Sequence, residues 1–145
     1  MININIAEIV PHDGKMLLLD KVIEYDQESL VAEAVVRGDG LFNQGGTVPA
    51  WLGIEYMAQT VAAQGGMQCY LAGKPIQLGF LLGSRKYISN VASFKVGDCL
   101  TISVKRLMED QGLGVFDCHI AGKGIDVSAK LNVYQPKESI NRVIS

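Results

Sequence analysis

Two residues of this sequence could move protons on a substrate: Glu55 and His12. Glu55 lies in residues 48–59, which read Val-Pro-Ala-Trp-Leu-Gly-Ile-Glu-Tyr-Met-Ala-Gln and predict a helix that is apolar around the carboxyl group. Because an ionised carboxylate is expensive to bury without a partner, its presence there indicates a chemical role. His12 is one of two histidines in the chain. A carboxyl group and an imidazole in an apolar cleft are sufficient for proton transfer on a small substrate.

Each candidate also has a structural interpretation. A carboxylate in a first helical turn is favoured by the helix dipole, but Gln59, one turn after Glu55 on the same face, could hydrogen-bond to it. Gln59 could equally be a buried structural amide. His12 has turn chemistry around it, yet an imidazole suits a general base near neutral pH. His119, beside Asp117, is expected to be an ordinary residue on the polar face of a strand, and the pair has too few ligands for a metal.

One long helix and several strands are predicted to position these residues. Pro49 fits a first helical position, and Gly73 followed by Pro75 predicts a helix end near Leu71. The helix is apolar around most of its circumference, so the rest of the chain should wrap it. Its glycines weaken it by about 1 kcal/mol each and are expected to permit close approach to a sheet. These glycines are Gly53, Gly65 and Gly66.

Alternating apolar residues predict strands at 30–37, 100–108, 113–121 and 125–134, and two apolar runs predict mid-sheet strands at 16–25 and 76–82. A single buried helix in a curved antiparallel sheet of about five to six strands is the α+β hot-dog fold. We therefore expect one hot-dog domain over residues 1–145. Because such a domain leaves an edge strand uncovered, we expect a homodimer or a hetero-oligomer as the working unit.

Composition excludes several classes of function. The chain has 145 residues, a net charge of −2 and 48% hydrophobic residues, which does not suggest a nucleic-acid surface. No apolar run approaches the roughly 18 residues that a membrane span needs. Three widely spaced cysteines without a C-x-x-C pattern favour reduced thiols in a cytoplasmic protein, with Cys69 expected to be a packing residue.

Three stretches of the sequence carry a family resemblance: Pro11-His12 with Leu18-Leu19-Asp20-Lys21-Val22, then Ile54-Glu55-Tyr56-Met57-Ala58-Gln59, then Val96-Gly97-Asp98. In order and spacing they resemble the β-hydroxyacyl-acyl carrier protein dehydratases of the FabZ/FabA type. That family has its catalytic histidine in a Gly-His-Phe-Pro loop before the helix, where this chain has Gly-Gly-Thr-Val-Pro at 45–49. The sequence of residues 49–59, with Pro-His-x-Gly-x-Met upstream, is more similar to that of the ApeP-like dehydratases of aryl-polyene clusters.

This resemblance implies dehydration of a 3-hydroxyacyl thioester on acyl carrier protein to the trans-2-enoyl or polyenoyl thioester, in fatty-acid-like or aryl-polyene biosynthesis. His12 is then expected to be the base, and Glu55, kept protonated by its apolar surroundings, the acid. No metal or organic cofactor is expected beyond the carrier's phosphopantetheine, because the thioester acidifies the carbon. The alternatives are a hot-dog acyl thioesterase and a catalytically silent subunit paired with an active dehydratase.

Further residues are candidates for binding the substrate and the carrier protein. A backbone N–H near Gly46 or Gly83 could bind the thioester carbonyl, although both could be plain turn glycines. Trp51 and Phe80 could line an acyl tunnel or simply belong to the core. Four basic residues could meet an acidic carrier protein or form a solvated cluster: Arg85, Lys86, Lys95 and Arg106.

Overall fold

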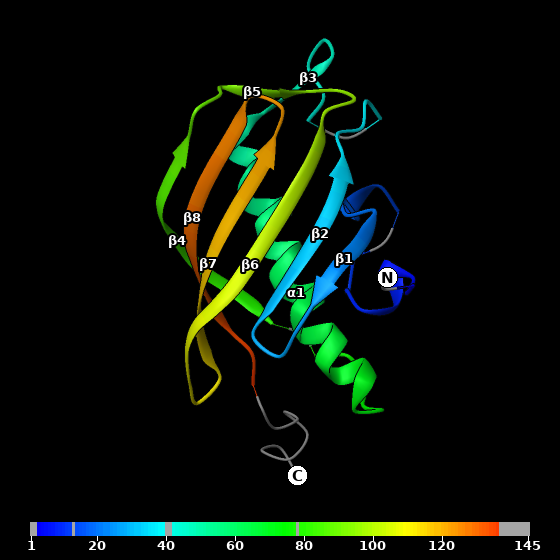
Figure 1. Ribbon diagram of the computed structural model, residues 1–145, viewed down its shortest axis with the longest axis vertical. Helices are drawn as coiled ribbons and strands as arrows, with labels where there is room; N and C mark the ends of the chain where they lie inside the picture. Colours follow the sequence, from blue (N-terminus) through cyan, green and yellow to red (C-terminus); the bar gives the residue numbers. More distant parts are fainter. Residues whose placement is uncertain (1–2, 13, 40–41, 78, 137–145) are drawn as a thin grey trace.

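The computed structural model describes residues 3–12, 14–39, 42–77 and 79–136. One long helix, α1 (Gly53–Leu71), lies across one face of a six-stranded antiparallel sheet (Figure 1). This arrangement confirms the predicted hot-dog fold. The strands follow the order β1 (Lys21–Tyr25), β2 (Ser29–Val35), β6 (Cys99–Asp110), β7 (Leu113–Gly122), β8 (Ile125–Tyr134) and β4 (Phe80–Ser89).

Short elements complete the fold at its ends. A two-stranded ribbon pairs β3 (Thr47–Pro49) with β5 (Ser93–Lys95), and three 3-10 turns precede the helix. These turns are η1 (Ile6–Glu8), η2 (Gly14–Met16) and η3 (Ala50–Leu52). Within the described residues, no helix is long and apolar enough to cross a membrane.

Turn residues and alternation explain the central hairpins. The β6–β7 turn places Gln111 and Gly112 at φ 50° and 88°, the two positive values that a tight hairpin turn requires. Along β6, every second residue from Leu100 to Val104 is buried against α1, and the same holds for β7 and β8. Burial of Cys118 in this layer raises the pKa of its thiol to about 12, as expected for a structural cysteine.

The two predicted mid-sheet strands are instead the sheet edges. β1 begins at Lys21, and residues 16–20 are not strand; they form a strap on α1, with Leu19 buried. β4 runs from Phe80 to Ser89, later than predicted, and Leu78 lies outside the described residues. The two apolar runs are not evidence of central strands, for two different reasons. Apolar residues of the strap at 16–20 pack on the helix, and those of β4, among them Leu82, are exposed at the sheet edge.

The helix begins later than predicted, because Pro49 ends β3 and caps η3, and α1 starts at Gly53. The prediction that helix glycines permit close approach to the sheet is confirmed at Gly53. A Cβ at Gly53 would overlap the Tyr87 hydroxyl on β4. At Gly66, however, the close neighbour is the backbone of Ile9 in the N-terminal segment rather than the sheet.

Candidate active site

The segment that carries His12 is held against α1 by one buried side chain. Gln59, which has 0% exposure, donates from Nε2 to the carbonyl of Met16 (2.6 Å) and accepts at Oε1 from the N–H of Leu18 (2.9 Å). Nε2 also donates to Oε1 of Glu55 at 3.0 Å. Both interpretations of Gln59 therefore apply, because it is a buried structural amide that also orients the candidate acid.

The structure brings Glu55 and His12 together, as the sequence predicted. Nε2 of His12 lies 3.6 Å from Oε1 of Glu55. This separation is too long for a hydrogen bond, so the imidazole and the carboxyl group are not hydrogen-bonded to each other. A reacting group can therefore lie against both. The Nδ1 atom of His12 is buried without a hydrogen-bond partner among the described residues. In this single chain the Glu55 side chain is 40% exposed, so its surroundings are less apolar than the sequence suggested.

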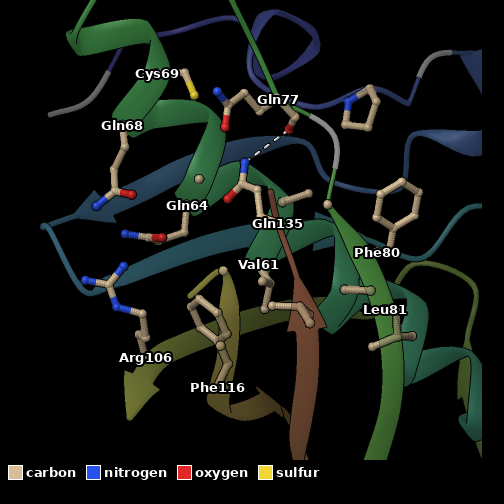
Figure 2. A pocket seen from close by; sticks show the side chains of 18 of the residues that line it. Val61, Gln64, Gln68, Cys69, Gln77, Phe80, Leu81, Arg106, Phe116 and Gln135 are labelled. Atoms are coloured by element: carbon tan, nitrogen blue, oxygen red, sulfur yellow. Dashed lines mark hydrogen bonds between the residues drawn. The ribbon is translucent and has the colours of Figure 1, made fainter. Parts of the chain in front are cut away.

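Both side chains line a cavity of about 430 Å³, a volume within the usual range for small-molecule sites. The helix side of the cavity includes a stripe of small residues in line with Glu55: Ala58, Ala62 and Gly65. Phe116 and Val133 line it from the sheet, and Phe80 and Leu81 from the edge strand (Figure 2). An acyl chain could therefore run along the helix over a mainly apolar floor.

Several lining residues were not anticipated from the sequence to lie in the cavity. They are polar and lie further along the helix, on β6 and after β8: Gln64, Gln68, Arg106 and Gln135. Cys69, predicted to be a packing residue, also lines the cavity. The available sequence signal was the spacing of Ala58, Ala62 and Gly65 at three and four residues, which marks a groove along the face that carries Glu55.

The other predicted binding residues are placed unevenly. Phe80 lines the cavity, whereas Trp51 lies outside its lining, is 56% exposed and packs edge-to-face on Phe42 at 5.1 Å. Gly46 lies in a loop with φ 92°, and Gly83 pairs with Asn132 in the edge of the sheet; neither lines the cavity of this chain. Their roles as carbonyl-binding donors stay predictions.

The predicted basic cluster is divided in the structure. Arg85 and Lys86 are exposed neighbours on β4, and Lys95 is exposed on β5. Arg106 does not belong with them, because it lines the cavity and forms an ion pair with Glu109 at 3.4 Å. Alternation along β6 turns Arg106 to the same face as the buried residues before it.

His119 is a surface residue, as predicted. Its Nε2 lies 2.5 Å from Oδ1 of Asp126, and the two side chains are 47% and 75% exposed. Asp117, its predicted neighbour, instead faces Lys130 at 3.8 Å. His119 therefore offers a control position for experiments on His12.

Replacing Gln59 with methionine should loosen the strap without removing either candidate catalytic group. We expect a loss of about 2 kcal/mol in unfolding free energy, since three hydrogen bonds of roughly 0.5–1.5 kcal/mol each are replaced by packing. Amide exchange at Leu18 should accelerate, and turnover should fall about tenfold through misplacement of His12. Gln59→Glu keeps the acceptor for Leu18 and should protect that amide better than methionine. Unchanged exchange at Leu18 in Gln59→Met would contradict the positioning role.

Comparison with known proteins identifies the family of this chain. Residues 4–145 match the ApeP-like family, described as ApeP dehydratase. A chain of the dehydratase heterocomplex ApeI:P from Xenorhabdus doucetiae is similar in structure, with a TM-score of 0.86, 31% identity and coverage of 99% of both chains. No curated protein matches the sequence significantly.

More distant structures share the fold alone. One is a hypothetical thioesterase with coenzyme A from Streptococcus pneumoniae TIGR4, with a TM-score of 0.58, 15% identity and coverage of 79% of this chain and 86% of that one. Another is the PaaI protein from the phenylacetic acid degradation operon of E. coli, with a TM-score of 0.59, 14% identity and coverage of 78% and 80%. The family match spans nearly the whole sequence, and this chain therefore belongs to the ApeP-like dehydratase family.

Proposed function

We propose that this protein dehydrates a 3-hydroxyacyl thioester, carried on the phosphopantetheine of an acyl carrier protein, to the trans-2-enoyl or polyenoyl thioester in fatty-acid-like or aryl-polyene biosynthesis in the cytoplasm. The observation that carries the proposal is the facing pair His12 and Glu55, 3.6 Å apart in one cavity. The small-residue stripe beside Glu55 supports a chain-shaped substrate. Membership of the dehydratase family supports the reaction type.

The pair can carry both proton transfers of the proposed reaction. His12 Nε2 takes the proton from C2, which the thioester carbonyl acidifies, so no further cofactor is required. The electron pair moves through an enolate, whose oxygen a backbone N–H group would stabilise. The C3–O bond then breaks, Glu55 gives its proton to the leaving hydroxyl, and water departs. The cycle leaves an imidazolium at His12 and a carboxylate at Glu55, and transfer of one proton from the first to the second restores both groups.

We propose that the working unit includes a second dehydratase chain. The edge strand β4 supports this, since it carries exposed apolar side chains and, among the described strands, pairs with β8 alone. These side chains are Phe80, Leu81, Leu82 and Ile88. The similar structure from Xenorhabdus doucetiae is a dehydratase heterocomplex. Arg85, Lys86 and Lys95 remain exposed and are the candidates for contact with the acidic carrier protein.

One assay separates the proposed function from its alternatives. A 3-hydroxyacyl-carrier protein is incubated with this chain alone and with a co-expressed dehydratase from the same genome, while conjugated enoyl absorbance and free thiol are followed. We expect enoyl absorbance without thiol release. Thiol release would show a thioesterase. Light scattering on the same samples gives the assembly, and a co-purifying complex whose rate is unchanged by inactivating this chain would show a silent subunit.

A further inference from the structure

The imidazole of His12 is not fixed by a hydrogen bond of its own. Among the described residues its Nδ1 atom has no partner, and its Nε2 atom lies 3.6 Å from Oε1 of Glu55. The position of the ring therefore depends on packing and on the backbone that carries it. The anchors of that backbone decide whether the imidazole faces the carboxyl group.

The turn around His12 is anchored on both sides. On the N-terminal side, Ile9 is 0% exposed, and its backbone lies so close to Gly66 on α1 that a Cβ there would overlap its carbonyl oxygen. On the C-terminal side, the N–H of Leu17 donates to the carbonyl of Gly14 at 3.2 Å across the 3-10 turn η2. A movement of Leu17 in the strap would therefore displace Gly14, which lies two residues after His12.

Side chains hold the first residues of the strap, which belong to no strand. Gln59 of α1 binds the carbonyl of Met16 and the N–H of Leu18. The carbonyl of Leu17, between these two residues, accepts a hydrogen bond from Nη2 of Arg37. Gln59 comes from the helix and Arg37 from the segment after β2, so two separate elements satisfy the backbone groups of the strap.

Arg37 reaches the strap from a fixed base. The preceding residue, Val36, is 1% exposed; its N–H donates to the carbonyl of Asp98 at 2.9 Å, and its carbonyl accepts from the N–H of Gly97 at 2.8 Å. The guanidinium also lies near the helix. Burial raises the pKa of Tyr56 on α1 to about 12, and the charge of Arg37 opposes this rise. The guanidinium thus lies where the strap, the end of β2 and the helix meet.

Arg37 also has an ordinary surface contact, because its Nε atom lies 3.8 Å from Oδ1 of Asp39. The Asp39 side chain is 61% exposed, and exposed ion pairs of this kind contribute little to stability. The bond to the Leu17 carbonyl is different, since a charged donor on a backbone acceptor is the stronger kind of hydrogen bond and also fixes a direction. The two contacts can be separated by substitution.

We propose that Arg37 is a positioning residue for His12: it holds the strap at Leu17 and thereby keeps the imidazole against Glu55. Without it, Gln59 alone would hold the strap, from the side of the helix. Arg37 does not line the cavity, so it acts through the strap and not on the substrate. The proposal rests on the proposed function for the role of His12 as base, and adds the residue that sets the position of that base.

The two histidines of the chain allow the position of His12 to be read directly. Ring signals of labelled histidine are recorded by NMR for the wild type and Arg37→Met, in the chain or in its complex with a partner dehydratase. We expect the His12 signals to shift or broaden, while those of His119, on the outer surface beside Asp126, stay in place. Arg37→Lys keeps a charged donor and should return the His12 signals toward those of the wild type. Unchanged His12 signals in Arg37→Met, or equal shifts of both histidines, would overturn the proposal.

Asp39→Asn is the matched control, since it removes the ion pair and leaves the bond between Arg37 and Leu17. It should keep the His12 signals and the turnover of the wild type. Displacement of His12 as large as in Arg37→Met would assign the effect to the surface ion pair and refute the role of the carbonyl contact.

Kinetics provide a second readout. Arg37→Met should lower kcat about tenfold through misplacement of the base, and should change KM by less than about twofold, because the residues that line the cavity are intact. A merely structural role would lower the melting temperature and leave kcat unchanged below it. Full kcat in Arg37→Met, or an effect confined to KM, would therefore contradict the positioning role.

The NMR readout is independent of dehydration. Displacement of His12 in Arg37→Met, with a wild type that forms no enoyl product, would leave the placement of His12 by Arg37 standing and refute the proposed function. Normal dehydration by the wild type with unmoved His12 signals in Arg37→Met would do the reverse.

Discussion

Replacing Glu55 with glutamine or His12 with alanine should slow dehydration of a 3-hydroxyacyl-carrier protein by about 10²–10⁴-fold, the usual contribution of a general acid or base. Glutamine keeps the size of Glu55 but cannot give a proton to the leaving hydroxyl. Alanine at position 12 removes the imidazole that lies 3.6 Å from the carboxylate. The measurement is the rise of enoyl absorbance in single turnovers, which reports the chemical step.

His119→Ala is the control for the loss of an imidazole, because His119 lies on the outer surface with Asp126. It should react at the wild-type rate. A decrease below tenfold for Glu55→Gln would show that the carboxyl is not the acid. The same result for His12→Ala would place the base elsewhere, and a partner chain would then be the next source to examine.

Gly66→Ala should destabilise the protein by about 3 kcal/mol, at the upper end of overpacking costs and in spite of alanine's better helix propensity. The added Cβ would overlap the carbonyl oxygen of Ile9 and lie 2.7 Å from its carbonyl carbon. Ile9 is 0% exposed, so its backbone cannot move without opening the core. For a chain of this size the melting temperature should fall by roughly 10 °C.

Gly65→Ala is the matched control for this experiment. Its Cβ would meet only the end of the Gln135 side chain, at 3.2 Å, and that side chain can rotate away. We therefore expect no loss of stability, or a gain of up to about 1 kcal/mol from helix propensity. Thermal unfolding at one fixed protein concentration compares both variants with the wild type. Equal melting temperatures for Gly65→Ala and Gly66→Ala would show that the N-terminal segment does not pack as described.

The architecture was largely predictable from local patterns. Alternation identified β6, β7 and β8, and the apolar composition around Glu55 identified the buried helix, because side-chain direction follows the period of each element. The neighbours of a strand are not encoded in its own residues. Apolar residues on both faces suggested central strands at 16–25 and 76–82, whereas these segments became a strap and two sheet edges.

The candidate catalytic pair was also accessible from the sequence, since a carboxylate in an apolar helix and a scarce histidine are unusual by residue type alone. Its geometry was not. Gln59 reaches 41 to 43 residues back to hold the strap, and Gln64 reaches 37 to 38 residues back to the β1–β2 turn. Residue types and local spacing thus determined the helix, the principal strands and the two proton-transfer candidates. Only tertiary structure decided how they meet and which polar groups line the cavity, because those contacts join segments whose separation in the chain carries no periodic signal.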